Sequence, residues 1–219
     1  MNILMRLCGL LFLLIIIVDF VSLAFGNKTI NGSDSNAKLQ KISGDPNKFK
    51  ISIGLVLLGR FSIIALAIML FVVFSPYNII LGIVGTIARI GEGLIQVYNE
   101  KNYWGLLNIA RQYSGTSGAE KNSWSDLALT IHKTQDSRFK FSLIFWAIGM
   151  LAYSIVFVTY GVVPLFIGWI GIIAGILVGF GSGIQLVKPK GPFEMVGLLT
   201  IVLEVILGGW LLFFSPIIP

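Results

Sequence analysis

The sequence has very few of the residues that build most catalytic and metal sites. Its 219 residues include one cysteine and one histidine, and only 12% of them are charged. Cys8 lies inside the first apolar run, so we expect no disulfide within the chain and no cysteine-based metal site. A zinc site or a Ser-His-Asp hydrolase site would have to be built around His132 alone, and nothing near it supports either. We therefore expect no catalytic activity, no metal and no cofactor.

The chain is rich in long apolar runs and poor in charged residues. Hydrophobic residues make up 56% of the chain and the mean hydropathy is +0.89, whereas about 25% of the residues of a soluble domain are charged. Six runs are long enough to cross a hydrocarbon core, which takes about 20 residues each. The sequence predicts an all-α, polytopic helical bundle in the cell membrane, a single domain over residues 1–219. The predicted spans cover residues 4–25, 51–74, 78–100, 139–160, 164–187 and 193–214.

The first run has features of a signal peptide as well as of a span. Arg6 precedes the apolar stretch, and Ser22 to Gly26 offers small residues at a cleavage position. Asp19 interrupts the run, and a carboxylate there is better explained as a partner for charges on other helices. We count the segment as the first span and keep cleavage as the alternative.

The connections between the runs differ in character. Residues 27–50 form a polar connection, and Ser75 to Asn78 is a tight turn in which proline ends one helix and asparagine caps the next. Between the third and fourth spans, two short amphipathic pieces predict interfacial helices.

The net charge of +6 is spread thinly over the loops. No dense basic patch is interleaved with aromatic residues, so the pattern does not indicate nucleic acid as a partner. Lys and Arg are concentrated in the connections after the first, third and fifth spans, and the positive-inside rule places those connections in the cytoplasm. The signal-like start of the chain indicates the reverse orientation, so both orientations stay open. Lipid is the expected partner, with other membrane proteins or a second copy of the chain as further candidates.

The third run carries one polar stripe along an otherwise apolar helix. Its members recur at spacings of three and four, which places them on a single helical face. They are Gly82, Gly85, Thr86, Arg89, Glu92, Gly93, Gln96, Asn99 and Glu100. We expect the other spans to pack around this stripe.

Five charged residues lie away from the ends of the predicted spans, namely Asp19, Arg60, Arg89, Glu92 and Glu204. Each would cost about 2.5 to 3.5 kcal/mol at a helix centre, so they should face inward and pair. Arg89 and Glu92 are three residues apart and can interact on their own helix. Arg60 and Glu204 are candidates to complete a network across helices. Three acids against two bases predict that one acid holds a proton.

The fifth run has the clearest packing signal, with glycine at every fourth position from Gly171 through Gly175 and Gly179 to Gly183. Such spacing lets two helix backbones approach closely in lipid. The glycine-bearing face of the third span is the expected partner. No repeat of the two three-span halves is visible, so an inverted-repeat transporter gains no support.

Several short stretches resemble DUF4386, a family of bacterial and archaeal membrane proteins of unknown function. The similar stretches are Arg89-Ile90-Gly91-Glu92, Gly149-Met150-Leu151, Pro164 to Gly171, and Glu204 with Trp210-Leu211-Leu212. The resemblance covers about residues 5 to 214 and implies a six-span architecture without an established activity. Arg60 departs from it, since relatives tend to carry acidic positions in that span, and the usual basic residue beside Pro164 is absent.

The sequence leaves two functions open. The first is an accessory or structural membrane component without catalytic activity, in which the charges hold helices in register. The alternative is a small transporter or ion-coupled carrier that uses Arg60, Arg89, Glu92 and Glu204, because intramembrane ionisable residues often mark ion or proton paths. An intramembrane enzyme would need a catalytic dyad at one depth, and the sequence offers none.

Overall fold

A computed structural model of the chain describes residues 2–25, 35–188 and 196–214, and these residues form α-helices and short connections without any strand. The helices in chain order are α1 (Asn2–Phe25), α2 (Ser35–Gly44), α3 (Pro46–Phe74), α4 (Ile79–Trp104), α5 (Leu106–Gly115), α6 (Gly118–Tyr160), α7 (Leu165–Val187) and α8 (Val196–Phe213). The predicted all-α helical bundle is confirmed.

Polar capping residues, a proline and a glycine set the helix boundaries. The Asp45 side chain accepts a hydrogen bond from the Lys48 backbone N–H at 3.0 Å, with Pro46 in the first turn of α3. Asn78 caps α4 in the same way, accepting from the Leu81 N–H at 3.1 Å. Gly161 ends α6 in the left-handed conformation, with φ of 62°. The tight turns at residues 75–78 and 161–164 therefore lie at one end of the bundle, which we call the turn end.

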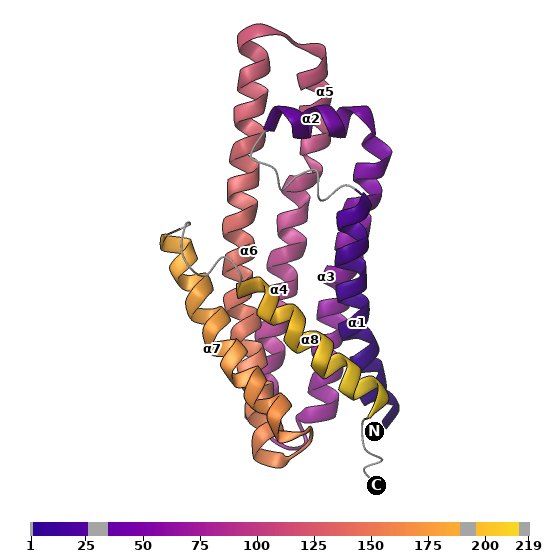
Figure 1. Cartoon of the computed structure of the whole chain (residues 1–219), viewed down its shortest axis with the longest axis vertical. Helices are drawn as coiled ribbons and strands as arrows, with labels where there is room; N and C mark the ends of the chain where they lie inside the picture. Colours follow the sequence, from indigo (N-terminus) through magenta and orange to yellow (C-terminus); the bar gives the residue numbers. More distant parts are fainter. Residues whose placement is uncertain (1, 26–34, 189–195, 215–219) are drawn as a thin grey trace.

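The helices other than α2 and α5 form a closed ring in chain order. Each of α1, α3, α4, α6, α7 and α8 packs against the next, and α8 returns to pack against α1 (Figure 1). Two glycines allow this closure, because a Cβ at Gly9 would lie 2.6 Å from the Gly208 carbonyl oxygen and one at Gly208 would lie 2.8 Å from the Phe12 Cβ. The α1–α8 contact is thus a close approach of two backbones.

Five of these helices are long and apolar enough to cross a membrane, and α8 contributes a shorter apolar stretch, Gly197–Phe213. The protein is a multi-pass membrane protein. The 18 residues of α8 would span about 27 Å at 1.5 Å per residue, just short of a hydrocarbon core of about 30 Å. The predicted sixth span began at residue 193, and residues 193–195 lie outside the described part of the chain.

The bundle continues beyond the apolar spans at the end opposite the turn end. The 43 residues of α6 make a helix of about 65 Å, twice the thickness of a hydrocarbon core. Its first half runs beside α5, and α2 lies across both (Figure 1). We call α2, α5 and residues 118–138 the extension. The predicted short helices of the long loop are therefore α5 and the beginning of α6, which continues without a break into the fourth span.

The extension has a hydrophobic core of its own, separate from that of the spans. Its buried members are Leu39, Ile42, Phe49, Ile53, Tyr103, Leu106, Leu107, Ile109, Ala110, Tyr113 and Ala128. For residues 35–50 the prediction of only a polar connection is wrong, because α2 buries Leu39 and Ile42 in this core. Only two apolar side chains of α2 do so, which is too few to give a recognisable helical pattern. Residues 27–34 of that connection lie outside the described part of the chain.

Candidate functional site

An arginine bound by two carboxylates lies in the middle of the ring. The Arg89 side chain is fully buried, and its Nη1 donates to Glu92 Oε2 at 2.7 Å while its Nη2 donates to Glu204 Oε1 at 3.2 Å. Glu204 Oε1 also accepts from Trp146 Nε1 at 2.8 Å, and Glu92 Oε1 accepts from Gln96 Nε2 at 3.1 Å. These five residues, which we call the Arg89 cluster, join α4, α6 and α8.

A glycine of α6 makes the space for Arg89. Arg89, Glu92 and Gln96 share one face of α4 because they are three and four residues apart. Opposite them, a Cβ at Gly149 of α6 would lie 2.7 Å from Arg89 Cγ and 3.2 Å from the Gly85 carbonyl oxygen. The missing side chain at Gly149 therefore admits the arginine between α4 and α6.

The other two predicted charges form a separate pair. Arg60 Nη1 of α3 donates to Asp19 Oδ2 of α1 at 3.2 Å. The second oxygen, Asp19 Oδ1, has no hydrogen-bond partner among the described residues. The structure thus brings Arg89, Glu92 and Glu204 together and places Arg60 with Asp19, whereas the sequence predicted one network with Arg60 and Glu204 as its cross-helix members.

Two adjoining cavities connect these groups with the extension. Their walls are mostly apolar, with several polar side chains among them, and we call them the polar cavities. The inner one has a volume of about 260 Å³ and is lined by Asp19, Arg60, Glu92, Gln96, Trp146, Thr200 and Glu204 among others. The outer one, of about 320 Å³, shares Asp19, Arg60 and Gln96 with it and adds Ser22, Asn99, Glu100, Tyr103, His132, Gln135 and Asp136. From Trp146 to His132 the path follows 14 residues of α6, or about 21 Å. It reaches Asp136, whose side chain is 52% exposed.

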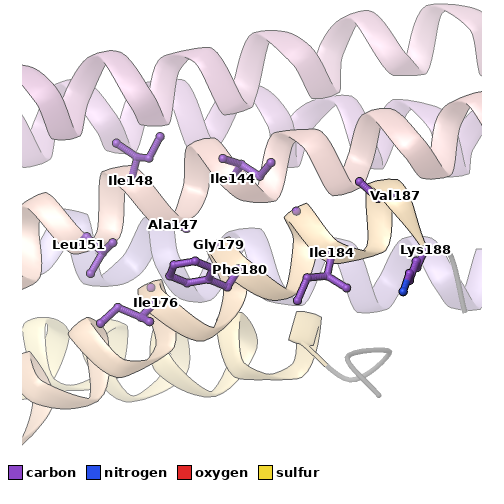
Figure 2. A pocket seen from close by; sticks show the side chains of 12 residues that line it. Ile144, Ala147, Ile148, Leu151, Ile176, Gly179, Phe180, Ile184, Val187 and Lys188 are labelled. Carbon is purple, nitrogen blue, oxygen red and sulfur yellow. The ribbon is translucent and has the colours of Figure 1, made fainter. Parts of the chain in front are cut away.

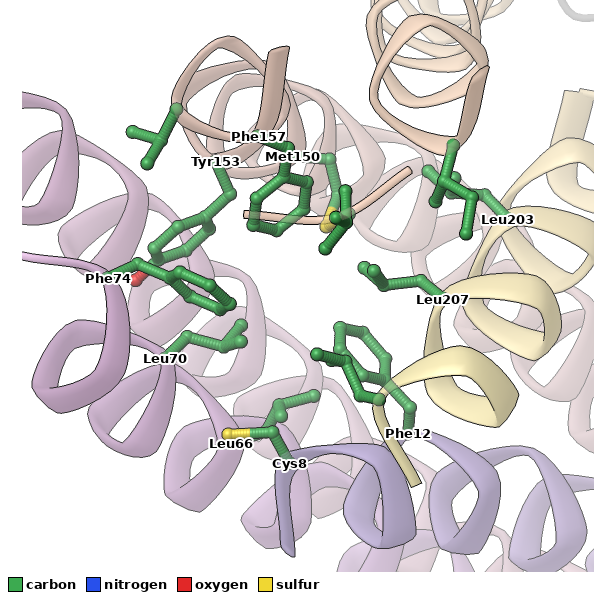
Figure 3. Packing of buried hydrophobic residues seen from close by; sticks show 14 of the residues in the cluster. Cys8, Phe12, Leu66, Leu70, Phe74, Met150, Tyr153, Phe157, Leu203 and Leu207 are labelled. Atoms are coloured by element: carbon green, nitrogen blue, oxygen red, sulfur yellow. The ribbon is translucent and has the colours of Figure 1, made fainter. Parts of the chain in front are cut away.

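An apolar layer fills the ring between the Arg89 cluster and the turn end. Side chains from α1, α3, α6 and α8 point toward a common centre in Figure 3. The layer includes Cys8, Phe12, Leu66, Leu70, Phe74, Met150, Tyr153, Phe157, Leu203 and Leu207. The polar cavities therefore reach the cluster from one side, while its other side is packed with hydrophobic side chains.

The family comparison accords with this architecture. The model of a domain of unknown function, DUF4386, matches residues 7–214, which is nearly the whole chain. The protein belongs to the DUF4386 family. No curated protein and no solved structure matches it. The resemblance found in the sequence is confirmed, and the family description names no activity.

The glycine series of this DUF4386 protein packs against a different helix from the one expected. A Cβ at Gly175 of α7 would lie 2.6 Å from Leu151 Cγ on α6, and one at Gly171 would lie closer still to the Ser154 hydroxyl of α6. A Cβ at Gly179 would meet only Ala147, at 3.2 Å, and one at Gly183 would meet no atom within 4 Å. The predicted partner, the glycine face of the third span, is wrong, because α6 lies between α4 and α7 in the ring.

The two helices diverge after Gly175 and leave an apolar groove on the outside of the DUF4386 bundle. The groove has a volume of about 700 Å³, and its walls are side chains such as Ile144, Ile148, Phe180 and Ile184, with Lys188 at one end (Figure 2). Apolar side chains on the outside of a membrane protein face lipid acyl chains. The groove is separate from the polar cavities.

Some members of the site carry a signal in the sequence and others do not. Gln96, Asn99 and Glu100 belong to the polar stripe of the third run. The sequence did not connect Trp146, Gly149 and His132 with this stripe. Helical spacing relates residues on one helix, so it does not specify which residues of α6 face the stripe of α4. Among the described residues no group of three or more His, Cys, Asp or Glu side chains is arranged to hold a metal ion.

Proposed function

We propose that this protein is a small transporter or ion-coupled carrier whose polar cavities lead from the extension to the Arg89 cluster. The observation that carries the proposal is the one-sided access. Polar cavities reach Glu92 and Glu204 from one end, and an apolar layer separates these carboxylates from the turn end. A binding site near mid-membrane that is accessible from one side is one state of an alternating-access cycle.

The chemistry of the cluster supports ion coupling. Arg89 carries one positive charge and lies between two carboxylates, both of which line the inner cavity. A proton or cation arriving through the cavity would neutralise the excess carboxylate, since unpaired charge is costly in this surrounding. Binding would then weaken one ion pair between Arg89 and a carboxylate. Such contacts hold α8, which carries Glu204, to the rest of the cluster.

The second candidate is the accessory component without catalytic activity. The short Arg89–Glu92 contact of 2.7 Å and the full burial of the arginine favour it, because both are typical of a structural link between helices. Under this candidate the cavities hold water and no solute crosses. We propose no catalytic role under either candidate.

Access is tested with cysteine labelling, for which the chain is well suited because Cys8 is its only cysteine. In a Cys8→Ala background, Thr200→Cys places a thiol in the inner cavity and Leu207→Cys places one in the apolar layer. A membrane-impermeant, positively charged methanethiosulfonate should label Thr200→Cys from the extension face and leave Leu207→Cys unlabelled. A carrier should also show slower labelling of Thr200→Cys from the turn end. Labelling of Thr200→Cys from neither face would contradict the proposal.

Flux is tested with protons as the probe. Vesicles containing the purified protein and an internal pH-sensitive dye should acidify under an inward proton gradient, faster than protein-free vesicles. Glu92→Gln should abolish this flux while the protein keeps its fold, and Glu120→Gln, at an exposed position of the extension, should not. No proton flux in the native protein, together with a loss of thermal stability in Glu92→Gln, would favour the accessory candidate.

A further inference from the structure

The outer cavity is lined by two amide side chains whose oxygens have no hydrogen-bond partner among the described residues. Asn99 Nδ2 donates to the Gln135 backbone carbonyl at 3.0 Å, and Gln96 Nε2 donates to Glu92 Oε1 and to Ser142 Oγ, both at 3.1 Å. Because a carbonyl and a carboxylate only accept hydrogen bonds, the orientation of both amides is determined. Asn99 Oδ1 and Gln96 Oε1 are the ends left over, and both residues are only 4% exposed.

The charges in the lining of the outer cavity favour a positively charged ligand. Three carboxylates, from Asp19, Glu100 and Asp136, stand against one arginine, Arg60, with His132 neutral. Lys140 binds Asp136 at 2.6 Å from outside the lining, and Arg60 is occupied by Asp19. Glu100 is 8% exposed and has no ion pair within the described residues. A buried carboxylate beside unpaired carbonyl oxygens would gain from a ligand that brings positive charge and hydrogen-bond donors.

The size and the aromatic members of the cavity narrow the choice of cation. A volume of about 320 Å³ accommodates several non-hydrogen atoms, so a bare ion would leave most of it empty. Tyr103 and Phe139 are in the lining, and aromatic faces favour organic cations. A primary ammonium group carries three N–H donors, one each for Asn99, Gln96 and the Glu100 carboxylate, all of which line this cavity.

We propose that the outer cavity binds a small protonated amine, with Glu100 supplying the opposing charge and Asn99 and Gln96 accepting its hydrogen bonds. The inference rests on the proposed function, because it assigns the substrate class to the same path. The free oxygen of Asp19 is the next acceptor inward, since Asp19 lines both cavities.

The test is a binding titration of the full chain in lipid nanodiscs. The probes are methylammonium and butylammonium, with potassium as the inorganic cation and 1-butanol as the neutral analogue of equal size. Butylammonium should bind more tightly than methylammonium, while potassium and 1-butanol should bind at least about tenfold more weakly than either amine, since one charge-assisted hydrogen bond is worth this much. Equal binding of butylammonium and 1-butanol would overturn the inference.

Two variants locate the site. Glu100→Gln keeps the size of the side chain and should weaken butylammonium binding about tenfold or more. Asp126→Asn removes an exposed carboxylate of α6 outside the lining and should leave binding unchanged. If both weaken binding equally, the amine is held by general surface charge and the inference is wrong. Should Glu100→Gln fail to fold, Asn99→Leu carries the same expectation.

A measurement of amine uptake distinguishes a failure of this inference from a failure of the proposed function. Radiolabelled methylammonium is offered to vesicles containing the native protein, beside the proton-flux measurement. Saturable amine binding without uptake or proton flux would support the amine site and contradict transport. Proton flux that depends on Glu92 without any amine binding would support transport and contradict the amine site.

Discussion

Gly149 of α6 and Arg89 of α4 touch so closely that a single added carbon would displace the arginine. A Cβ at position 149 would lie 2.7 Å from Arg89 Cγ, well inside the ordinary contact distance of about 3.5 to 4.0 Å between carbon atoms. Cγ lies close to the backbone, so a shift of Cγ also moves the guanidinium at the end of the side chain. The contact of two residues 60 positions apart therefore determines where the central charge of the bundle lies.

The first prediction follows from this contact. Gly149→Ala should lower the stability of the bundle by about 1 to 3 kcal/mol, the usual cost of overpacking a filled core. Gly183→Ala is the matched control, because an added Cβ there meets no atom within 4 Å. The gain in helix propensity should make the control neutral or slightly stabilising. Thermal unfolding of both variants in detergent measures the difference, and equal Tm values would show that Arg89 adapts without cost.

A double-mutant cycle tests the Arg89 cluster. Arg89→Met should destabilise the protein by about 3 to 5 kcal/mol, because it leaves carboxylates buried without a counter-charge. Adding Glu204→Gln to Arg89→Met should recover part of this loss, whereas two independent sites would give additive losses. Titration with a denaturing detergent measures the four proteins. The exposed pair Lys140–Asp136 is the control, and Asp136→Asn should change stability by no more than about 1 kcal/mol.

The core of the extension gives a third prediction. Leu39 of α2 is fully buried in it, and Leu39→Ala should cost about 2 to 5 kcal/mol through lost burial and a residual cavity. Leu127 of α6 is 43% exposed, so Leu127→Ala should have a much smaller effect. Protease sensitivity of α2 reports the undocking directly, with rapid cleavage expected in Leu39→Ala. Equal cleavage of the two variants would mean that α2 contributes little to the extension.

The only histidine makes a pH prediction easy to measure. His132 lies in the extension, seven residues before the predicted fourth span, and burial together with the nearby Lys38 lowers its pKa below the ordinary 6.5, while Asp136 and Gln135 act in the opposite direction. The unfolded chain then takes up a proton at a pH where the folded chain does not. Stability should therefore rise with pH between the lowered pKa and 6.5 and fall on acidification through that window.

A nuclear magnetic resonance titration of the His132 ring gives the pKa directly. Lys38→Gln should raise it by removing a nearby positive charge, and Asp136→Asn should lower it further. A pKa above 6.5 in the native protein would contradict the burial of His132 beside the outer cavity.

The sequence alone determined the class of the protein and most of its helices. Runs of about 20 apolar residues have only one stable form in lipid, since a helix satisfies its own backbone hydrogen bonds. The polar stripe of α4 was visible for the same reason, because residues three and four apart must share a face. The Arg89–Glu92 pair follows from that spacing alone.

Only the tertiary structure decided which helices face one another. Gly9 meets Gly208, Gly149 admits Arg89, and Glu204 accepts from both Arg89 and Trp146. Each of these contacts joins helices that are distant in sequence. The partner of the glycine series was mistaken because small residues indicate a close approach without specifying the helix that approaches. Which cavity the stripe lines depends on the ring order, and ring order arises from side-chain packing across helices rather than from any periodicity within one helix.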